Sequence, residues 1–162
     1  MGQTSEFSLE GILQNDRIRH LRPHKVPMLG RKATVGDAVS AMQKTRRSCV
    51  LVFRDKDLVG IFTERDVLVK ASDNRPETFK TPLEQVMTPN PKTIQINDSI
   101  LRAIQIMSVQ GFRHLAVIEE DGSCVGTVSI RNLLVYLAEH FPQSVYNLPP
   151  MSGQINEDRD GA

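Results

Sequence analysis

The chain contains two copies of one sequence pattern, and this duplication restricts the folds open to it more than any other feature. The two halves align at one offset, which grows by one residue beyond a polar turn. The matched pairs include Ala38 with Ala103, Met42 with Met107, Val52 with Val117, Gly60 with Gly126, Arg65 with Arg131 and Leu68 with Leu134. A change in length costs least in such a turn. The pattern therefore predicts a duplicated structural unit.

Each copy predicts the order strand, helix, strand, strand, helix, in a mixed α/β (α+β) fold. Thr34 and Asp37 form the outline of a capping box before the first helix, and Ser99 begins its counterpart. The remaining predicted elements are the lead-ins Val26–Leu29 and Thr93–Gln95, the strands Cys49–Phe53, Leu58–Phe62, Leu115–Ile118 and Cys124–Val128, and the second helices Glu64–Lys70 and Ile130–Glu139.

One such unit buries only a small core, so the two β-α-β-β-α repeats are expected to pack sheet to sheet as one pseudo-two-fold module. An amphipathic pattern over residues 6–22 adds an N-terminal helix. The expected division is an N-terminal segment 1–21, repeat one 22–72, a linker 73–83, repeat two 84–141, and a tail 142–162 whose last ten residues are expected to be disordered.

Composition excludes several function classes. The net charge of +1 disfavours nucleic-acid binding, and no apolar run approaches the length of a membrane span. The N-terminus lacks a signal-peptide pattern, so we expect a cytoplasmic protein in which Cys49 and Cys124 are buried free thiols. The chain has no nucleotide P-loop, zinc-binding or catalytic motif, which predicts no metal, no required cofactor and no catalytic residues.

Two motifs at matched positions carry a family resemblance. Gly60-Ile-Phe-Thr63-Glu-Arg-Asp66 and Gly126-Thr-Val-Ser129-Ile-Arg-Asn132 each join a predicted strand to a predicted helix, and Val86-Met87-Thr88 opens the second copy. Over roughly residues 22–141 the chain resembles a tandem pair of cystathionine-β-synthase (CBS) domains, also called a Bateman module.

The resemblance implies binding of adenosine-containing ligands: AMP, ADP or ATP, with S-adenosylmethionine or a nicotinamide dinucleotide (NAD) as further members of the class. It also implies crossed sites, in which the motif of one copy works with the lead-in of the other. Carried onto this sequence, Thr63 and Asp66 would act with Thr88, Lys92, Thr93 and Ile94, Ser129 and Asn132 would act with Val26, Pro27 and Met28, and Arg113 and His114 would reach the phosphates.

The motif chemistry is consistent with this implication. A hydroxyl at a helix N-cap, as at Thr63, lies beside free N–H groups that attract anions. The Asp66 carboxylate can accept both hydroxyls of a ribose, whereas Asn132 offers one neutral carbonyl oxygen. We therefore expect the Asp66 site to be the stronger one. Arg47 is the nearest basic candidate in the first copy, and Arg131 is given no role.

The resulting prediction is a regulatory module that binds an adenine nucleotide between its repeats without chemistry and acts on a separate effector protein. The alternative is a structural or interaction module whose ligand sites have decayed. A homodimer is expected in either case, because the second helices carry surplus apolar residues: Val67, Leu68, Leu133, Leu134 and Leu137.

Overall fold

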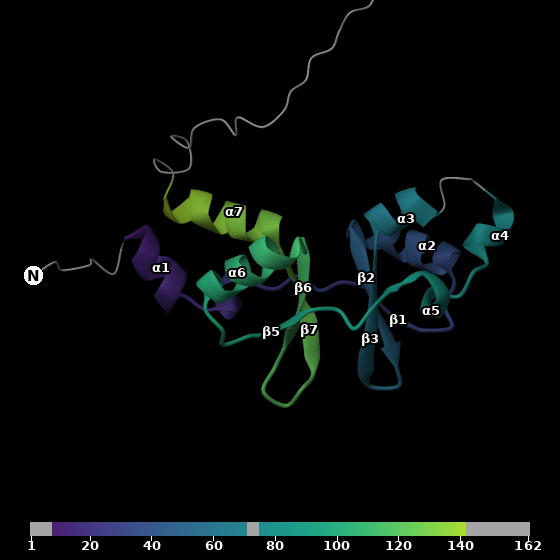
Figure 1. Ribbon diagram of the computed structural model, residues 1–162, viewed down its shortest axis with the longest axis horizontal. Coiled ribbons are helices and arrows are strands. Elements are labelled where there is room, and N and C mark those ends of the chain that lie inside the picture. Colours follow the sequence, from purple (N-terminus) through teal and green to yellow (C-terminus); the bar gives the residue numbers. More distant parts are fainter. Residues whose placement is uncertain (1–7, 71–74, 142–162) are drawn as a thin grey trace, which may run out of the picture.

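The computed structural model describes residues 8–70 and 75–141, which form two repeats side by side (Figure 1). The first repeat contains β1 (Met28–Gly30), α2 (Val35–Thr45), β2 (Cys49–Arg54), β3 (Asp57–Thr63) and α3 (Glu64–Lys70). The second contains β5 (Thr93–Gln95), α6 (Ile100–Gln110), β6 (His114–Ile118), β7 (Cys124–Ser129) and α7 (Ile130–His140). The predicted element order is confirmed in both repeats.

Each sheet has the same internal pairing. β1 is parallel to β2 and β2 is antiparallel to β3, while β5 is parallel to β6 and β6 is antiparallel to β7. A register shift interrupts β2 at Val52/Phe53 and β6 at Val117/Ile118, which are equivalent places. The duplication seen in the sequence is therefore reproduced down to an irregularity of the backbone.

Reciprocal capping begins the helices at the positions that the sequence indicates. Thr34 Oγ1 accepts a hydrogen bond from the Asp37 N–H at 3.2 Å, and Asp37 Oδ2 accepts one from the Thr34 N–H at 2.8 Å. Ser99 Oγ caps α6 by accepting from the Arg102 N–H at 3.2 Å. These bonds satisfy N–H groups that a helix start otherwise leaves without partners.

The N-terminal region differs from the single helix expected over residues 6–22. Helix α1 (Leu9–Asn15) ends at Asp16, whose backbone is extended, and a short 3₁₀ helix η1 (Ile18–Leu21) follows. The Ile18 N–H donates to the Asp98 carbonyl at 2.9 Å, so the chain bonds to the second repeat instead of continuing the helix. Tertiary pairing overrides the helical pattern here.

The connection between the repeats is more structured than a polar linker. It contains α4 (Pro76–Phe79), α5 (Leu83–Val86) and β4 (Thr88–Pro89), which are not among the elements predicted from the sequence. Elements of two to four residues carry too little periodicity to be recognised. Residues 71–74 of the linker and the tail from 142, including its expected disorder, lie outside the described residues.

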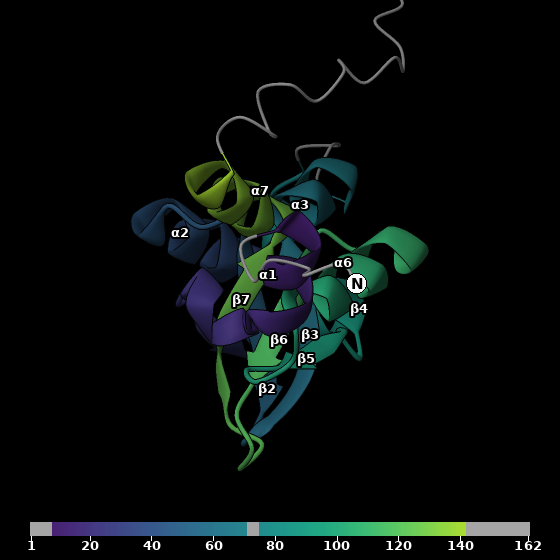
Figure 2. The ribbon, with the colours of Figure 1, turned by 90° about the vertical axis from the view of Figure 1, so that its left-hand side faces the viewer.

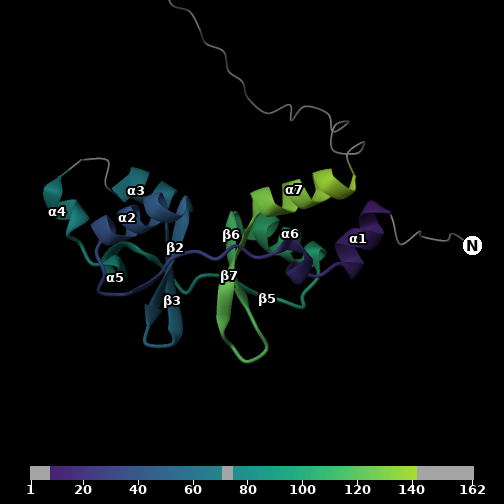
Figure 3. The same ribbon diagram turned by 180° about the vertical axis from the view of Figure 1, so that it is seen from behind.

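The two repeats exchange their leading segments. Ile18 is fully buried in the core of the second repeat, and Leu83 is fully buried in the core of the first. The backbone bonds match as well: the Ile18 N–H donates to Asp98 at 2.9 Å, and the Leu83 N–H donates to Ala33 at 2.7 Å. Each core is therefore completed by a segment that precedes the opposite repeat, and the chain between η1 and β1 crosses from one repeat to the other (Figure 3).

A third apolar cluster joins the two sheets. Val26, Cys49, Leu51, Ile61 and Ala116 are buried together at the seam between the repeats. Both sheets contribute to it, which is the sheet-to-sheet packing expected from the sequence. α3 and α7 flank this seam, one from each repeat, and both lie on the same face of the molecule, above the sheets (Figure 2).

The crossing chain approaches β7 closely at Gly126. The backbone there has φ +149°, and a Cβ at this position would overlap the His24 carbonyl. Gly126→Ala is therefore expected to lower the free energy of unfolding by about 2 kcal/mol or more. Gly30→Ala is the matched control, since an added Cβ there meets nothing within 4 Å and should change stability by less than about 0.5 kcal/mol. Urea unfolding measures both, and equal effects would contradict the close approach.

Candidate functional site

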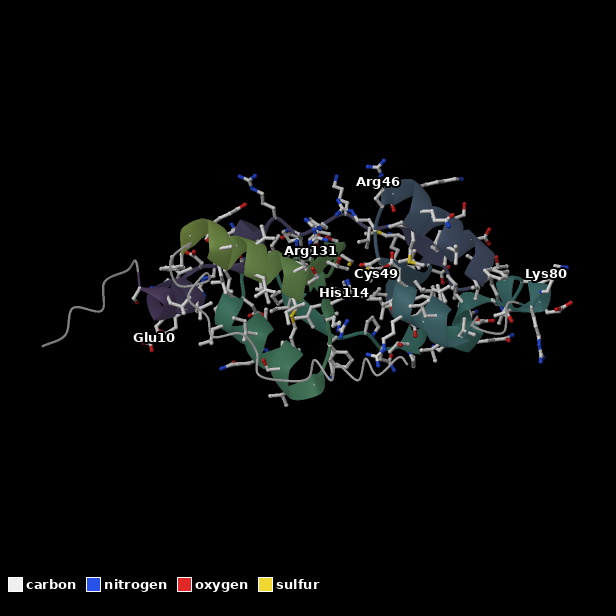
Figure 4. All side chains as sticks on the ribbon, turned by 90° about the horizontal axis from the view of Figure 1, so that it is seen from above. Glu10, Arg46, Cys49, Lys80, His114 and Arg131 are labelled. Atoms are coloured by element: carbon white, nitrogen blue, oxygen red, sulfur yellow. The ribbon has the colours of Figure 1, made fainter. Side chains whose placement is uncertain are left out.

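A cleft of about 1120 Å³ lies between the two repeats. Its walls come from the segment Asp16–Val26, the chain around the start of β2, and α7. Figure 4 looks onto this region from above, with Arg131, Cys49 and His114 near the seam and Glu10 and Lys80 at opposite ends. The charged lining consists of Arg19, Arg22, Arg46, Arg47 and Arg131, the carboxylates Asp16, Glu64 and Glu139, and several histidines.

Backbone pairing fixes the position of His24 over the beginning of α7. The His24 N–H donates to the Thr127 carbonyl at 2.8 Å, and the Thr127 N–H donates back at 2.9 Å. The His24 backbone can come this close to β7 because Gly126 has no side chain. His24 therefore lies beside Asn132, with an Asn132 Nδ2 to His24 Nε2 distance of 3.1 Å.

The Ser129 and Asn132 side chains are held in a capping box at the first turn of α7. Asn132 Oδ1 accepts from the Ser129 N–H and from the Ser129 hydroxyl, each at 2.8 Å. This corrects one expectation: the carbonyl oxygen of Asn132 is already engaged at the helix start. The amide nitrogen Nδ2 lies outside the capping box and beside His24, which also lines the cleft, so Asn132 offers a ligand a hydrogen-bond donor.

The equivalent group in the first repeat has the same box with different chemistry. Asp66 Oδ2 accepts from the Thr63 N–H and hydroxyl, both at 2.9 Å, and its other oxygen accepts from Lys70 Nζ at 3.0 Å. Thr88 pairs with Ile61 of β3, as its counterpart His24 does with Thr127 of β7. The crossed placement of motifs and lead-ins is thus present in both halves.

The structure does not bring all the sequence-predicted residues to this cleft. Ser129, Asn132, Val26 and His114 line it. The others lie outside its lining: Thr63, Asp66, Thr88, Lys92, Thr93, Ile94, Pro27, Met28 and Arg113. Ile94 is buried in the core of the second repeat and Met28 is exposed, whereas the Pro27 carbonyl pairs with the Leu51 N–H at 2.9 Å.

His114 reaches across the seam between the repeats. Its Nε2 lies 3.1 Å from the hydroxyl of Ser48, which belongs to the first repeat. Burial lowers its pKa from the ordinary value of 6.5, Arg113 lowers it further, and Glu64 opposes the shift. The ring is therefore neutral near pH 7 and joins the two repeats by a neutral hydrogen bond.

Sequence reasoning missed several cleft residues. Arg131 and His24 received no role, although Arg131 follows Ser129 by only two positions. The pKa of His24 is lowered first by burial and then by the charges of Arg47 and Arg131, which indicates that all three lie close together. The direction of a side chain in the first turn of a helix depends on its packing, so the motif alone could not reveal this.

The cysteines are unsuited to chemistry near neutral pH. Cys49 is buried and Cys124 is half-buried, a small correction to the expectation that both are buried. Burial raises the pKa of Cys49 to about 11 and also raises that of Cys124. Neither thiol is a nucleophile under ordinary conditions, because the thiolate is the reactive form.

Two further findings concern residues 8–70 and 75–141 only. These residues contain no group of three or more histidine, cysteine, aspartate or glutamate side chains able to hold a metal ion. None of their helices is long and apolar enough to cross a membrane.

Comparison with known protein sequences identifies relatives from several organisms. An uncharacterised 17.7 kDa protein of Acidianus ambivalens is 33% identical over 118 residues, covering 72% of this chain and 70% of that protein. A CBS domain-containing protein of Arabidopsis thaliana is 35% identical over 107 residues, covering 65% of this chain and 19% of its own length. The chain therefore corresponds to a small part of the plant relative.

Solved structures of CBS domain proteins resemble this chain over most of its length. A CBS domain protein of Pyrobaculum aerophilum complexed with AMP has a TM-score of 0.66 at 26% identity, covering 76% of this chain and 99% of that one. Another CBS domain structure has a TM-score of 0.67 at 28% identity, covering 75% and 96%. The CBS domain family itself matches residues 18–73 and 83–139. With both repeats matched, the chain belongs to the CBS domain family as a tandem pair.

Proposed function

We propose that this protein is a regulatory module that binds an adenine nucleotide in the cleft beside Ser129 and Asn132. The observation that carries the proposal is the 1120 Å³ cleft, whose lining joins the second motif to the lead-in of the first repeat. The AMP complex of the Pyrobaculum aerophilum relative supports the ligand class. S-adenosylmethionine and NAD remain further members of the class.

In this proposal the two repeats contribute different parts of the site. Val26, buried at the seam, offers an apolar surface to the adenine, and the Asn132 amide donates to a ribose or phosphate oxygen. His114, bonded to Ser48 of the other repeat and paired with Ser129 in the sheet, also lines the cleft. A ligand here contacts both repeats and so favours one arrangement of them, which is regulation without chemistry.

The second site, made of Thr63 and Asp66 with Thr88, Lys92, Thr93 and Ile94, is proposed to be weaker. This reverses the ranking expected from the sequence. Lys70 holds the outward oxygen of Asp66 and also donates to the Val86 carbonyl, so a ribose would have to displace it.

The proposal is tested by placing in each motif the side chain that the other motif carries, aspartate at position 132 and asparagine at position 66. Asn132→Asp keeps the oxygen that the capping box needs but replaces the donor in the cleft with a negative charge. It is expected to weaken AMP or ADP binding at least about tenfold. Asp66→Asn is the matched control and should leave the tighter binding event within about twofold. Calorimetry measures both affinities. Loss of the tighter event in Asp66→Asn alone would reject the ranking, and absence of adenine-nucleotide binding in the wild type would reject the function.

The non-enzymatic part of the proposal is tested by incubation with ATP. Binding without sustained release of phosphate is expected, because in this proposal the cleft residues hold a ligand between the two repeats and perform no chemistry. Steady phosphate release by repurified protein would overturn it.

A homodimer is proposed as the form that passes the signal to a separate effector protein. Leu68 on α3 and Leu134 on α7 are more than half exposed, and the two helices lie on the same side of the molecule (Figure 2). Leu133 is buried, so its expected place in this surface was wrong. The same surface is the specific support for the alternative function, an interaction module.

The dimer is tested by light scattering. The wild type should have twice the mass of one chain at micromolar concentration, and Leu68→Glu combined with Leu134→Glu should give a monomer, because a buried unpaired carboxylate opposes association. Val109→Glu, at an exposed position on α6, is the control that should stay dimeric. A monomeric wild type would contradict the proposal.

The cleft histidines predict how stability depends on pH. The pKa values of His24 and His114 lie below the ordinary 6.5, so the unfolded chain binds protons before the folded protein does. The free energy of unfolding should therefore fall as pH is lowered from 7.5 through 6.5 to 5.5. His24→Gln combined with His114→Gln should flatten this slope. Urea titrations measure it, and an unchanged slope would assign the effect to other groups.

A further inference from the structure

We propose that the cleft selects its ligand by charge, through a group made of Arg47, His24, Asn132 and Arg131, and that it prefers a nucleoside di- or triphosphate to a monophosphate or a cationic adenosine compound. This inference rests on the proposed function and specifies its ligand. Two of these residues, Arg47 and His24, lie outside the duplicated motifs, whereas Arg131 and Asn132 belong to the second one.

Two hydrogen-bond donor groups compete for the single accepting nitrogen of His24. Arg47 Nη1 lies 3.0 Å from His24 Nδ1, and Asn132 Nδ2 lies 3.1 Å from His24 Nε2. Guanidinium and amide NH₂ groups only donate, while a neutral imidazole has one accepting nitrogen. At most one of these two contacts is therefore a satisfied hydrogen bond. A ligand that supplies several acceptor oxygens at this point would satisfy the others.

Arg47 and Arg131 give this group of residues its positive charge. Within residues 8–70 and 75–141, neither Arg47 nor Arg131 forms an ion pair. Both charges act on His24 and lower its pKa, so they lie close to the same point from two different repeats. Two unpaired guanidinium groups that converge in this way favour a multiply charged anion over a single charge.

The two repeats differ in charge at equivalent positions. The first repeat has Asp66 where the second has Asn132, and the leading segment of the second repeat has Glu84 where that of the first has Arg19. Glu84 is paired with Arg31 and Lys32. The second repeat thus carries a neutral amide at the position where the first carries a carboxylate. This asymmetry is what a polyphosphate site requires, because a carboxylate there would repel it.

The test is a calorimetric series without divalent cations, using adenosine, AMP, ADP, ATP and S-adenosylmethionine. Affinity should rise at least about tenfold from AMP to ATP, and S-adenosylmethionine should bind more weakly than AMP. Inorganic tripolyphosphate should compete with ATP. The preference for ATP should shrink as salt concentration rises, since charge carries it.

A double variant identifies the residues. Arg47→Ala combined with Arg131→Ala should reduce ATP affinity to about that of AMP while AMP affinity falls less. Arg65→Ala is the matched control: Arg65 occupies the position equivalent to Arg131 and lies outside the cleft lining, so ATP affinity should not change. An equal loss for all ligands in the double variant would overturn the assignment of these residues.

The outcomes separate this inference from the proposed function. If AMP binds as tightly as ATP, selection by charge is wrong and the nucleotide-binding function stands. If tripolyphosphate binds but no adenosine compound adds affinity, the nucleotide function is wrong and the anion site stands. If none of the probes binds, both are rejected.

Discussion

The exchange of leading segments between the repeats is the constraint on which the rest of the structure depends. Ile18 completes the core of the second repeat and Leu83 completes that of the first, each fully buried. Neither core is complete in its own half of the sequence, so neither half has an apolar interior independent of the other. The family match begins at residues 18 and 83, which places both segments inside the repeated unit.

The cleft follows directly from this exchange. To bring Ile18 into the second repeat and then start β1 in the first, the chain must cross the seam, and the crossing stretch carries His24 past β7. The glycine at 126 lets that stretch pass at hydrogen-bond distance. The site is thus a product of connectivity, because the residues that line it are those that the crossing chain and the start of α7 bring together.

The duplication allows most of the fold, including the order of strands and helices, to be predicted from the sequence alone. Matched residues such as Gly60 and Gly126 established two equal units, and polar caps such as Ser129 indicated where helices start. Backbone pairing between distant segments could not be predicted. The helical pattern of the sequence continues past Asp16 to residue 22, yet backbone hydrogen bonds to the second repeat end the helix at Asp16. The same limit applies to the site, since Arg131 was visible in the motif but its direction depends on packing across the seam. The Asn132 amide was misread for a related reason, because its oxygen is taken up by its own helix start.

That capping arrangement separates folding from recognition within one side chain. The helix start uses only the oxygen that aspartate and asparagine have in common, as the boxes at Thr63 and Ser129 show. The remaining atom, oxygen in one repeat and nitrogen in the other, takes no part in the capping box. A duplicated protein of this kind can therefore diverge in the polarity of one of its two sites by a single-atom change, while both halves keep the same architecture.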